Sequence, residues 1–235
     1  MMIKYAFFDV DETVIRFKSM FLFHEYYCKN VGPTSGLIGG IRHRNFIRKV
    51  RNHLQRGRSR EFINALYYRD FKGRKHETVK HMVREWYRDL IGRESSIFVL
   101  PVLDIIRRHK ESGSKIILVS GSFMELLEPI GEEIGADRVL ATQLEVIHGR
   151  YTGRIIPPQM IGAGKAVAVR TLIAAEGGDR ENSWAYGDHT SDIAMLEEVG
   201  HPTIVSRDQH MIDIATERGW NIVDPLSMSR ETSYA

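Results

Sequence analysis

Residues 3–13 of the chain are IKYAFFDVDET. The apolar run from Ile3 to Phe8 is short and ends in acids, which favours a strand buried on both faces over a helix of that length. Asp9 and Asp11 follow two positions apart, and in extended backbone residues i and i+2 point the same way. Both carboxylates would then face one ligand if the strand continued. Such a pair suits a nucleophile with an acid/base partner or a hard divalent cation, and a polar turn at the strand end is the alternative.

The chain after residue 95 alternates between strand-like and helical segments. We expect strands at 115–119, 139–144, 183–186 and 202–205, helices at 102–111, 123–134, 164–175, 192–198 and 210–218, a hairpin pairing 143–147 with 151–156, and a short edge strand at 221–223. This alternation predicts an α/β fold with a Rossmann-like parallel sheet and helices on both faces. In such folds ligands bind at the carboxyl ends of the strands.

Residues 16–94 follow a different pattern. Helical stretches rich in aromatic and charged residues occur at 19–28, 46–54, 61–71 and 77–90, with no convincing strand between them. This segment interrupts the α/β pattern directly after the first strand. We therefore predict an α/β core formed by residues 1–15 and 95–235 and an all-helical cap formed by residues 16–94, placed to cover the edge where the first strand ends.

The composition is that of an ordinary globular protein, with 235 residues of which 43% are hydrophobic and 27% charged. Cys28 is the single cysteine, which excludes an intramolecular disulfide framework and a cysteine-built zinc site and indicates a reducing compartment. No segment reaches the roughly 20 apolar residues of a membrane helix, and the N-terminal apolar run is too short for a signal peptide. We expect a soluble, cytoplasmic protein without a membrane partner, and both a homodimer and a monomer stay open.

The basic residues are unevenly placed, although the formal net charge is only +3. The stretch from residue 42 to residue 60 contains no acid, and its basic residues are Arg42, Arg44, Arg48, Lys49, Arg51, Arg56, Arg58 and Arg60. This run would either steer anions toward a site or form a solvated helix face. A third interpretation is contact with nucleic-acid phosphates, but the run offers only Phe46 for base stacking, which argues against it.

Two further polar features lie near predicted strand ends. Ser120-Gly121-Ser122 ends the second strand, where backbone amides can hold an anion, although such residues are also common in turns for capping reasons. Lys165 follows Gly162-Ala163-Gly164 at a predicted helix start, where a cation opposes the helix dipole unless it meets an anion. A solvated lysine is the simpler alternative.

The segment 187–192, GDHTSD, places Asp188 and Asp192 four residues apart at the end of another strand and the start of a helix. Helix capping would account for one of these acids but hardly for both. Along the chain the order is thus an acid pair, a Ser-Gly turn, a lysine and a second acid pair. Because the carboxyl ends of parallel strands meet at one edge of the sheet, we expect these features to form one site.

These segments resemble the haloacid dehalogenase superfamily of phosphohydrolases, specifically its subfamily IB, the phosphoserine-phosphatase-like group with a helical C1-type cap inserted after the first strand. The resemblance is carried by FFDVDET at 7–13, LVSGS at 118–122, Lys165 and YGDHTSDIAML at 186–196. Residues 126–155 also look like this group. The resemblance covers nearly the whole chain and implies a phosphoric monoester hydrolase.

The resemblance implies a reaction through an aspartyl-phosphate. Asp9 would be the nucleophile, and Asp11 would protonate the leaving oxygen and later activate the hydrolytic water. Mg²⁺ would be bound by Asp9, the backbone carbonyl of Asp11 and Asp188, with Asp192 orienting the set. The groups implied to hold the phosphoryl oxygens are Thr13, Ser120, Gly121 and Lys165.

One departure from the group concerns the substrate. Phosphoserine phosphatases carry a glutamate nine positions after the nucleophile, which helps to bind the substrate's amino group, whereas this chain has Lys18 there. A cation would repel an ammonium group, so we expect a phosphorylated sugar, cyclitol, polyol acid or other small anionic metabolite instead of free phosphoserine. Because of their place in the predicted cap, the candidates for substrate contact are Phe17, Lys18, Met20, Phe21 and Arg42. Phosphoryl transfer to another acceptor, a nucleic-acid-associated phosphatase and a binding protein without catalysis are the alternatives.

Overall fold

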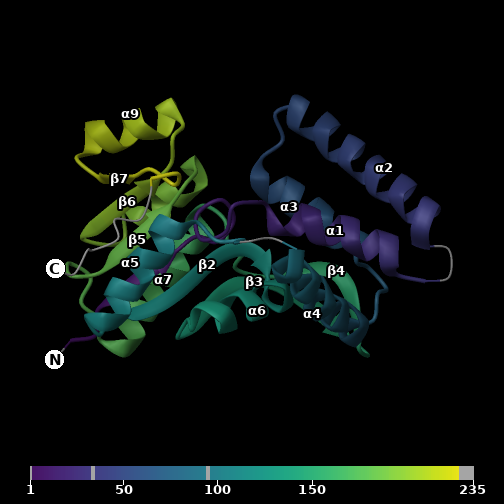
Figure 1. The fold of residues 1–235 in the computed structure, drawn as a ribbon, viewed down its shortest axis with the longest axis horizontal. Coiled ribbons are helices and arrows are strands. Elements are labelled where there is room, and N and C mark those ends of the chain that lie inside the picture. Colours follow the sequence, from purple (N-terminus) through teal and green to yellow (C-terminus); the bar gives the residue numbers. More distant parts are fainter. Residues whose placement is uncertain (1, 33–34, 94–95, 228–235) are drawn as a thin grey trace.

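The structure is a computed structural model that describes residues 2–32, 35–93 and 96–227. A mixed sheet extends from the left of the molecule to below the helices at the right, and those helices come from the first half of the chain (Figure 1). The predicted α/β fold class is confirmed, because the described strands form one sheet with helices on both faces. None of the described helices combines the length and the apolar character that crossing a membrane requires. The cytoplasmic location stays a prediction.

Among the described residues, the sheet has seven strands in the order β4-β3-β2-β1-β5-β6-β7. Its strands are β1 (Tyr5–Phe8), β2 (Lys115–Phe123), β3 (Arg138–Ile147), β4 (Arg150–Ile156), β5 (Trp184–Gly187), β6 (His201–Val205) and β7 (Asn221–Val223). Every neighbouring pair is parallel except β3 and β4, which form the predicted antiparallel hairpin. The short strand β1 therefore lies between β2 and β5, in the middle of the sheet.

Side chains of β1 alternate between two apolar layers. Ala6 and Phe8 pack in the layer that contains α5 (Leu100–Glu111) and α6 (Met124–Ile134). Tyr5 and Phe7 pack in the opposite layer with α7 (Ala163–Glu176), α8 (Ile193–Leu196) and α9 (Gln209–Arg218). All four β1 side chains are buried. The continuous apolar run is thus required because helices cover both faces of the sheet.

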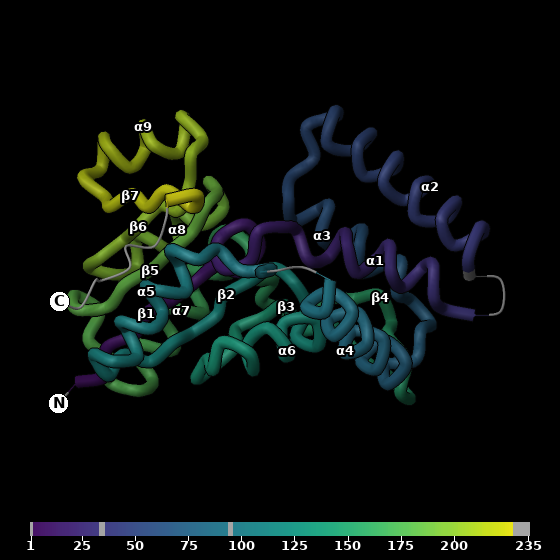
Figure 2. Tube along the Cα trace, in the orientation of Figure 1, coloured from purple at the N-terminus to yellow at the C-terminus, as the bar shows by residue number. Residues whose placement is uncertain are grey.

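In the part of the chain that the structure describes, four helices lie between β1 and α5, as the sequence predicted, and we call them the helical insertion. They are α1 (Ser19–Asn30), α2 (Ser35–Gln55), α3 (Arg60–Asp70) and α4 (His76–Arg93). The insertion packs on the sheet through an aromatic cluster in which the rings of Phe71 and Phe123 lie 5.8 Å apart. Figure 2 shows α2 as the outermost helix, on the side of α1 that faces away from α4.

The start of α2 differs from the expected helix at 46–54, because the helix begins at Ser35. Its first turns contain Gly36, Gly39 and Gly40, which have low intrinsic helix propensity and conceal a helix from sequence patterns. Gly39 is required by packing, since a Cβ there would lie 2.0 Å from the backbone oxygen of Cys28 on α1. Close packing of two helices therefore outweighs local propensity.

Two other boundaries differ from expectation. Ser120-Gly121-Ser122 lies within β2, whose register against β3 shifts between Ser120 and Phe123, and α6 begins only at Met124. Ser120 Oγ accepts a hydrogen bond from the backbone N–H of Ser122 at 3.1 Å, which holds this irregular turn of the strand. The helix expected at 192–198 is a 3₁₀ turn, Thr190–Asp192, followed by the short α8.

Candidate active site

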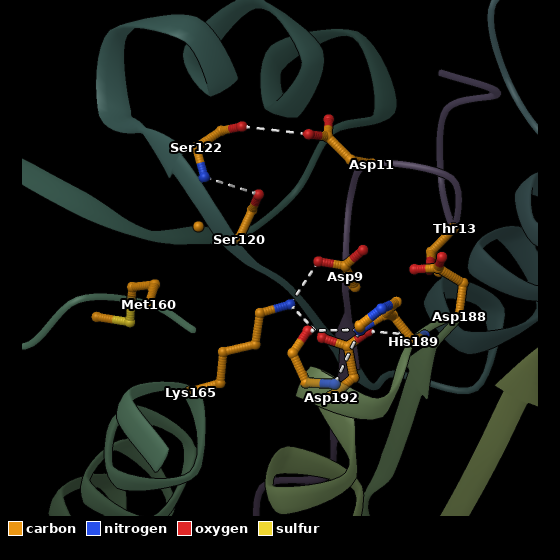
Figure 3. Close-up of polar contacts among 12 residues, drawn as sticks. Asp9, Asp11, Thr13, Ser120, Ser122, Met160, Lys165, Asp188, His189 and Asp192 are labelled. Carbon is orange, nitrogen blue, oxygen red and sulfur yellow. Dashed lines mark hydrogen bonds and ion pairs between the residues drawn. The ribbon is translucent and has the colours of Figure 1, made fainter. Parts of the chain in front are cut away.

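The polar residues predicted to converge do meet at the carboxyl ends of β1, β2 and β5 (Figure 3). Asp9 follows β1 directly, and its backbone N–H donates to the oxygen of Tyr186 on β5 at 2.9 Å. Ser120 lies in β2 and Asp188 follows β5. Because β1 lies between these two strands, Asp9 occupies the centre of the site.

The chain turns sharply after Asp9. The backbone N–H groups of residues 13–15 all donate to the oxygen of Val10, and Glu12 has a positive φ of 67°. The strand therefore does not continue, and the condition for Asp9 and Asp11 to point the same way is not met. The turn instead carries Asp11 toward α1. Asp11 and Asp9 nevertheless line one cavity, which lies over the carboxyl ends of the strands.

Asp11 is held by groups from two elements. Its Oδ1 accepts from the backbone N–H of Ser19 at 3.1 Å, and its Oδ2 accepts from Ser122 Oγ at 3.4 Å. Burial raises the pKa of Asp11, and the hydrogen bonds from Ser19 oppose this effect. The side chain is thus fixed between the first helix of the insertion and β2, separate from the carboxylate of Asp9.

Lys165 forms a buried ion-pair network with two acids. Its Nζ donates to Asp9 and, at 2.7 Å, to Asp192 Oδ1, and only 3% of the lysine is exposed. Burial alone would lower the pKa of Lys165, but the charges of Asp192 and Asp9 outweigh it and raise this pKa. The lysine at the start of α7 therefore meets the anionic partners that the helix-dipole argument requires.

Three carboxylates gather around this lysine. One oxygen from each of Asp9, Asp188 and Asp192 lies within 4.8 Å of the others. Burial raises the pKa of Asp188 to about 8, with the charges of Asp9 and Asp192 adding to the effect. Burial likewise raises the pKa of Asp9 to about 6, although Lys165 opposes it. A single lysine does not balance three clustered acids, of which Asp9 and Asp192 are buried and Asp188 is partly buried. Clustered carboxylate oxygens are the ligands that hard divalent cations prefer, so the cluster fits such a cation.

His189 caps the 3₁₀ turn beside this cluster. Its Nδ1 accepts from the backbone N–H of Ser191 at 3.0 Å, while its own backbone N–H donates to Asp192 Oδ2 at 3.2 Å. Burial and the nearby Arg60 lower the pKa of His189. His189 is therefore the N-cap of this turn, and the cap fixes the carboxylate of Asp192 against the lysine.

A cavity of about 250 Å³ lies over these groups. One wall is formed by the residues gathered at the carboxyl ends of β1, β2 and β5, which we call the reacting edge. They are Asp9, Asp11, Ser120, Gly121, Lys165 and Asp192. The opposite wall consists mainly of apolar side chains, with two cations and one amide, and these residues are Lys18, Met20, Phe21, Leu54, Arg60, Ile63, Asn64 and Tyr67. Ile161, which also lines the cavity, lies against Gly121. Thr13 and Asp188 lie beside the cavity, joined by a 3.3 Å hydrogen bond from Thr13 Oγ1 to Asp188 Oδ1.

The candidates for substrate contact divide into two groups. Lys18, Met20 and Phe21 line the cavity, whereas Phe17 and Arg42 are not among the lining residues. Arg42 is directed into the helical insertion, where its Nη2 lies 2.6 Å from an oxygen of Asp70. Lys18 lies 3.1 Å from Glu12, so its charge is partly balanced by the chain itself.

Sequence reasoning missed the residues that α3 brings to the cavity. Asn64 Nδ2 donates to the backbone oxygen of Gly121 at 2.9 Å, and its Oδ1 accepts from Gln159 at 2.7 Å. Arg60 Nη1 donates to Ser191 Oγ at 3.1 Å. The only signal in the sequence was the position of Arg60 at the end of the basic run, because helical periodicity does not say which neighbour a polar face meets.

Comparison with known proteins shows the family of the chain. The family model for haloacid dehalogenase-like hydrolases matches residues 6–197. A protein of Streptomyces azureus named for inhibition of morphological differentiation is 35% identical over 222 residues, covering 93% of this chain and 77% of that protein. A probable phosphatase of Mycobacterium tuberculosis is 31% identical over 230 residues, covering 97% and 76% of the two chains.

Solved structures resemble the fold at lower identity. A protein of unknown function from Bordetella pertussis matches with a TM-score of 0.82 and 23% identity, over 96% of this chain and all of that one (100%). A phosphoserine phosphatase with an analogue of its phospho-aspartyl intermediate matches with a TM-score of 0.63 and 18% identity, over 96% and 94% of the chains. The relatives named as phosphatases agree with the expected enzyme class, a phosphoric monoester hydrolase. The chain therefore belongs to the haloacid dehalogenase-like hydrolase family and resembles its phosphoserine-phosphatase group, as the sequence predicted.

Proposed function

We propose that the protein is a Mg²⁺-dependent phosphatase that hydrolyses a small phosphate monoester through an aspartyl-phosphate on Asp9. The observation that carries this proposal is the buried contact of Lys165 with Asp9 and Asp192, next to Asp188. A phosphate dianion approaches a carboxylate only if positive charge neutralises their repulsion. Lys165 supplies one such charge from the protein itself.

Mg²⁺, when bound by Asp9, the backbone carbonyl of Asp11 and Asp188, would supply the remaining positive charge at the phosphoryl oxygens. The chain's own residues would do the rest. Lys165 orients the carboxylate of Asp9 and neutralises phosphoryl oxygens, while Asp192 fixes the lysine. Asp9 attacks phosphorus, and the bond from phosphorus to the leaving oxygen breaks.

Asp11 would handle the proton. Ser19 and Ser122 hold its carboxyl group at the cavity wall, away from the lysine network. From there it would protonate the leaving oxygen and then take a proton from the water that hydrolyses the acyl phosphate. Thr13, Ser120 and Gly121 would hold the transferred phosphoryl oxygens.

The helical insertion would act as the cap domain formed by residues 16–94, over a core formed by residues 1–15 and 95–235. In this arrangement the cap chooses the substrate, because it provides most of the cavity wall that faces the reacting edge. Among the described lining residues, the acids are the three of the reacting edge, Asp9, Asp11 and Asp192. An ammonium group would thus find no carboxylate on the cap side, and Lys18 and Arg60 would oppose it.

We therefore propose an anionic or neutral metabolite without an amino group, such as a phosphorylated sugar, cyclitol or polyol acid. Phosphoserine phosphatases among the relatives of this chain act on an amino acid phosphate, and the cavity argues for a different selection here. Transfer of the phosphoryl group to another acceptor would use the same residues. Product analysis with added alcohols separates the two reactions.

The experiment is phosphate release from p-nitrophenyl phosphate with and without Mg²⁺. We expect release only with Mg²⁺, and we expect Asp9→Asn to abolish it, because an amide is not a nucleophile for phosphorus. Asp213→Asn on the exposed face of α9 is the matched control and should keep full activity. Full activity of Asp9→Asn would show that the nucleophile is another residue.

A further inference from the structure

The outer face of α2 carries exposed apolar side chains at its beginning. Leu37, Ile38 and Ile41 are 79%, 58% and 43% exposed. None of them belongs to the apolar clusters that form the core of the described structure. Three large apolar side chains within two turns of one helix are therefore in contact with solvent in the isolated chain.

The opposite face of α2 is the one that packs on the protein. Gly39, Phe46 and Val50 are buried, and they recur at the spacing of one helix face. His43, on the same face, contacts His24 of α1 with 2.9 Å between their Nδ1 atoms. The packing of α2 is thus satisfied without Leu37, Ile38 or Ile41, so these three require another explanation.

Basic side chains continue the outer face toward the end of the helix and into the following loop. They are Arg44, Arg48, Lys49, Arg51, Arg56 and Arg58, and all six are exposed. Within the part of the chain that the structure describes, none of these six forms a salt bridge. The sequence has no acid between Glu25 and Glu61 that would balance them.

The two ends of the same basic run behave differently. Arg42 pairs with Asp70 inside the insertion, and Arg60 donates to Ser191 beside the cavity. Within this basic run, the cations that form no salt bridge in the described structure therefore lie on the outer face of α2 and in its loop, next to the apolar side chains. One surface thus combines both kinds of group.

Leu37, Ile38 and Ile41 favour a partner with an apolar interior, and the cations require that the partner be anionic. An anionic bilayer meets both demands, since a helix of this kind buries its apolar side chains among lipid chains while its cations contact the headgroups. Nucleic acid would use the cations alone, because the aromatic residue of α2, Phe46, is buried and offers no face for stacking. A second copy of this basic face would be repelled by its charge.

We propose that the outer face of α2, from Leu37 to Arg51, binds the surface of an anionic lipid bilayer, contrary to the expectation from the sequence of a protein without a membrane partner. Leu37, Ile38 and Ile41 enter the acyl boundary, and Arg44, Arg48, Lys49 and Arg51 contact the phosphates. Leu54, in the last turn of α2, lines the active-site cavity. The same helix therefore connects the lipid contact with the cavity wall. The proposal concerns binding and does not depend on the proposed catalysis.

The test is flotation of the full-length Asp9→Asn protein with vesicles, so that catalysis plays no part. One set of vesicles contains phosphatidylcholine alone, and the other contains equal parts of phosphatidylcholine and phosphatidylglycerol. We expect at least tenfold more bound protein on the anionic vesicles and a loss of binding at high salt. Two variants test the apolar and the basic side chains separately, and they are Leu37→Ser/Ile38→Ser/Ile41→Ser and Arg44→Gln/Arg48→Gln/Arg51→Gln. Each should reduce binding at least tenfold.

Matched controls change exposed residues elsewhere. Ile147→Ser/Ile156→Ser on the β3–β4 hairpin and Arg84→Gln/Arg88→Gln/Arg108→Gln on α4 and α5 should bind like the parent. Unchanged melting temperatures show that each variant is folded. Absence of binding to anionic vesicles overturns the proposal, as does equal binding by the α2 variants. Binding to a labelled single-stranded oligonucleotide without binding to vesicles would assign the face to nucleic acid. A dimer that dissociates in the Leu37→Ser/Ile38→Ser/Ile41→Ser variant would assign the face to a second copy of the chain. Both outcomes overturn the proposal.

Discussion

The two walls of the cavity differ in how their side chains are held. At the reacting edge, Lys165 and Asp192 are 3% and 2% exposed, and Lys165 donates to both Asp192 and Asp9. On the helical insertion, Met20 and Phe21 are only partly buried, and Arg60 is exposed and bound to one hydroxyl group. The side chains of the first wall are thus buried and hydrogen-bonded to one another, while those of the second are more exposed and make fewer polar contacts. We infer that the sheet edge determines the reaction and the insertion determines the substrate.

The largest expected effect on activity and stability comes from replacing Lys165 at the reacting edge. Lys165→Met removes the charge and leaves Asp9 and Asp192 buried without their cation. We expect activity on p-nitrophenyl phosphate to fall about 10²–10³-fold. The free energy of unfolding should fall by about 3–5 kcal/mol, because breaking a buried pair leaves uncompensated charge. Urea unfolding and steady-state kinetics measure the two effects.

Lys165→Arg is the companion variant, since it keeps the charge but changes its geometry. It should recover part of the lost stability and little of the activity, because the guanidinium group does not fit the position of a single ammonium group. If Lys165→Met unfolded at the same urea concentration as the wild type, the ion-pair network would not contribute to stability.

A smaller effect is expected on stability when the packing of the helical insertion is changed away from the reacting residues. Gly39→Ala places a Cβ 2.0 Å from the Cys28 oxygen, so α1 and α2 must move apart. We expect a loss of about 1–3 kcal/mol in the free energy of unfolding. Gly40 has no atom within 4 Å of such a Cβ, so Gly40→Ala should stabilise the helix by about 0.5–1 kcal/mol. Thermal unfolding of the pair checks both signs, and equal effects would contradict the close approach of α1 and α2 at Gly39.

The smallest effect tests whether the insertion selects the substrate. Arg60→Gln removes a cation from the cavity wall without touching the lysine network. For phosphate monoesters with a second anionic group we expect KM to rise about tenfold, equivalent to about 1.4 kcal/mol. For p-nitrophenyl phosphate, which lacks such a group, kcat and KM should stay unchanged. A parallel loss on both substrates would assign Arg60 to the reaction and would remove the distinction between the walls.

The sequence predicted the reacting edge better than the insertion, for a physical reason. Parallel strands carry their carboxyl ends to one edge, so Asp9, Ser120 and Asp188 had to meet once the strands were recognised. The orientation of Asp11 was not predictable in this way, because it depends on a turn about Val10 and on a hydrogen bond from Ser19. Strand alternation describes only residues that remain in the strand.

The cavity wall of the insertion was harder to predict, because helical patterns identify a buried face but not its neighbour. Phe17 and Arg42 were candidates by position alone, and neither lines the cavity. Arg60 and Asn64 lie on α3 and reach the cavity only because of how that helix packs on the sheet. The first turns of α2 escaped prediction because glycine carries no helical signal, while Gly39 is explained by contact with α1.

The central claim is that Asp9 receives the phosphoryl group, and acid-quench mass spectrometry tests it most directly. The Asp11→Asn variant is mixed with p-nitrophenyl phosphate and Mg²⁺ and quenched in acid, because loss of the general base should slow hydrolysis of the intermediate. We predict a phosphoryl group on the peptide that contains Asp9, absent when Mg²⁺ is chelated and absent from the Asp9→Asn/Asp11→Asn double variant. A phosphoryl group on another residue, or turnover without any covalent species on Asp9, would contradict the account.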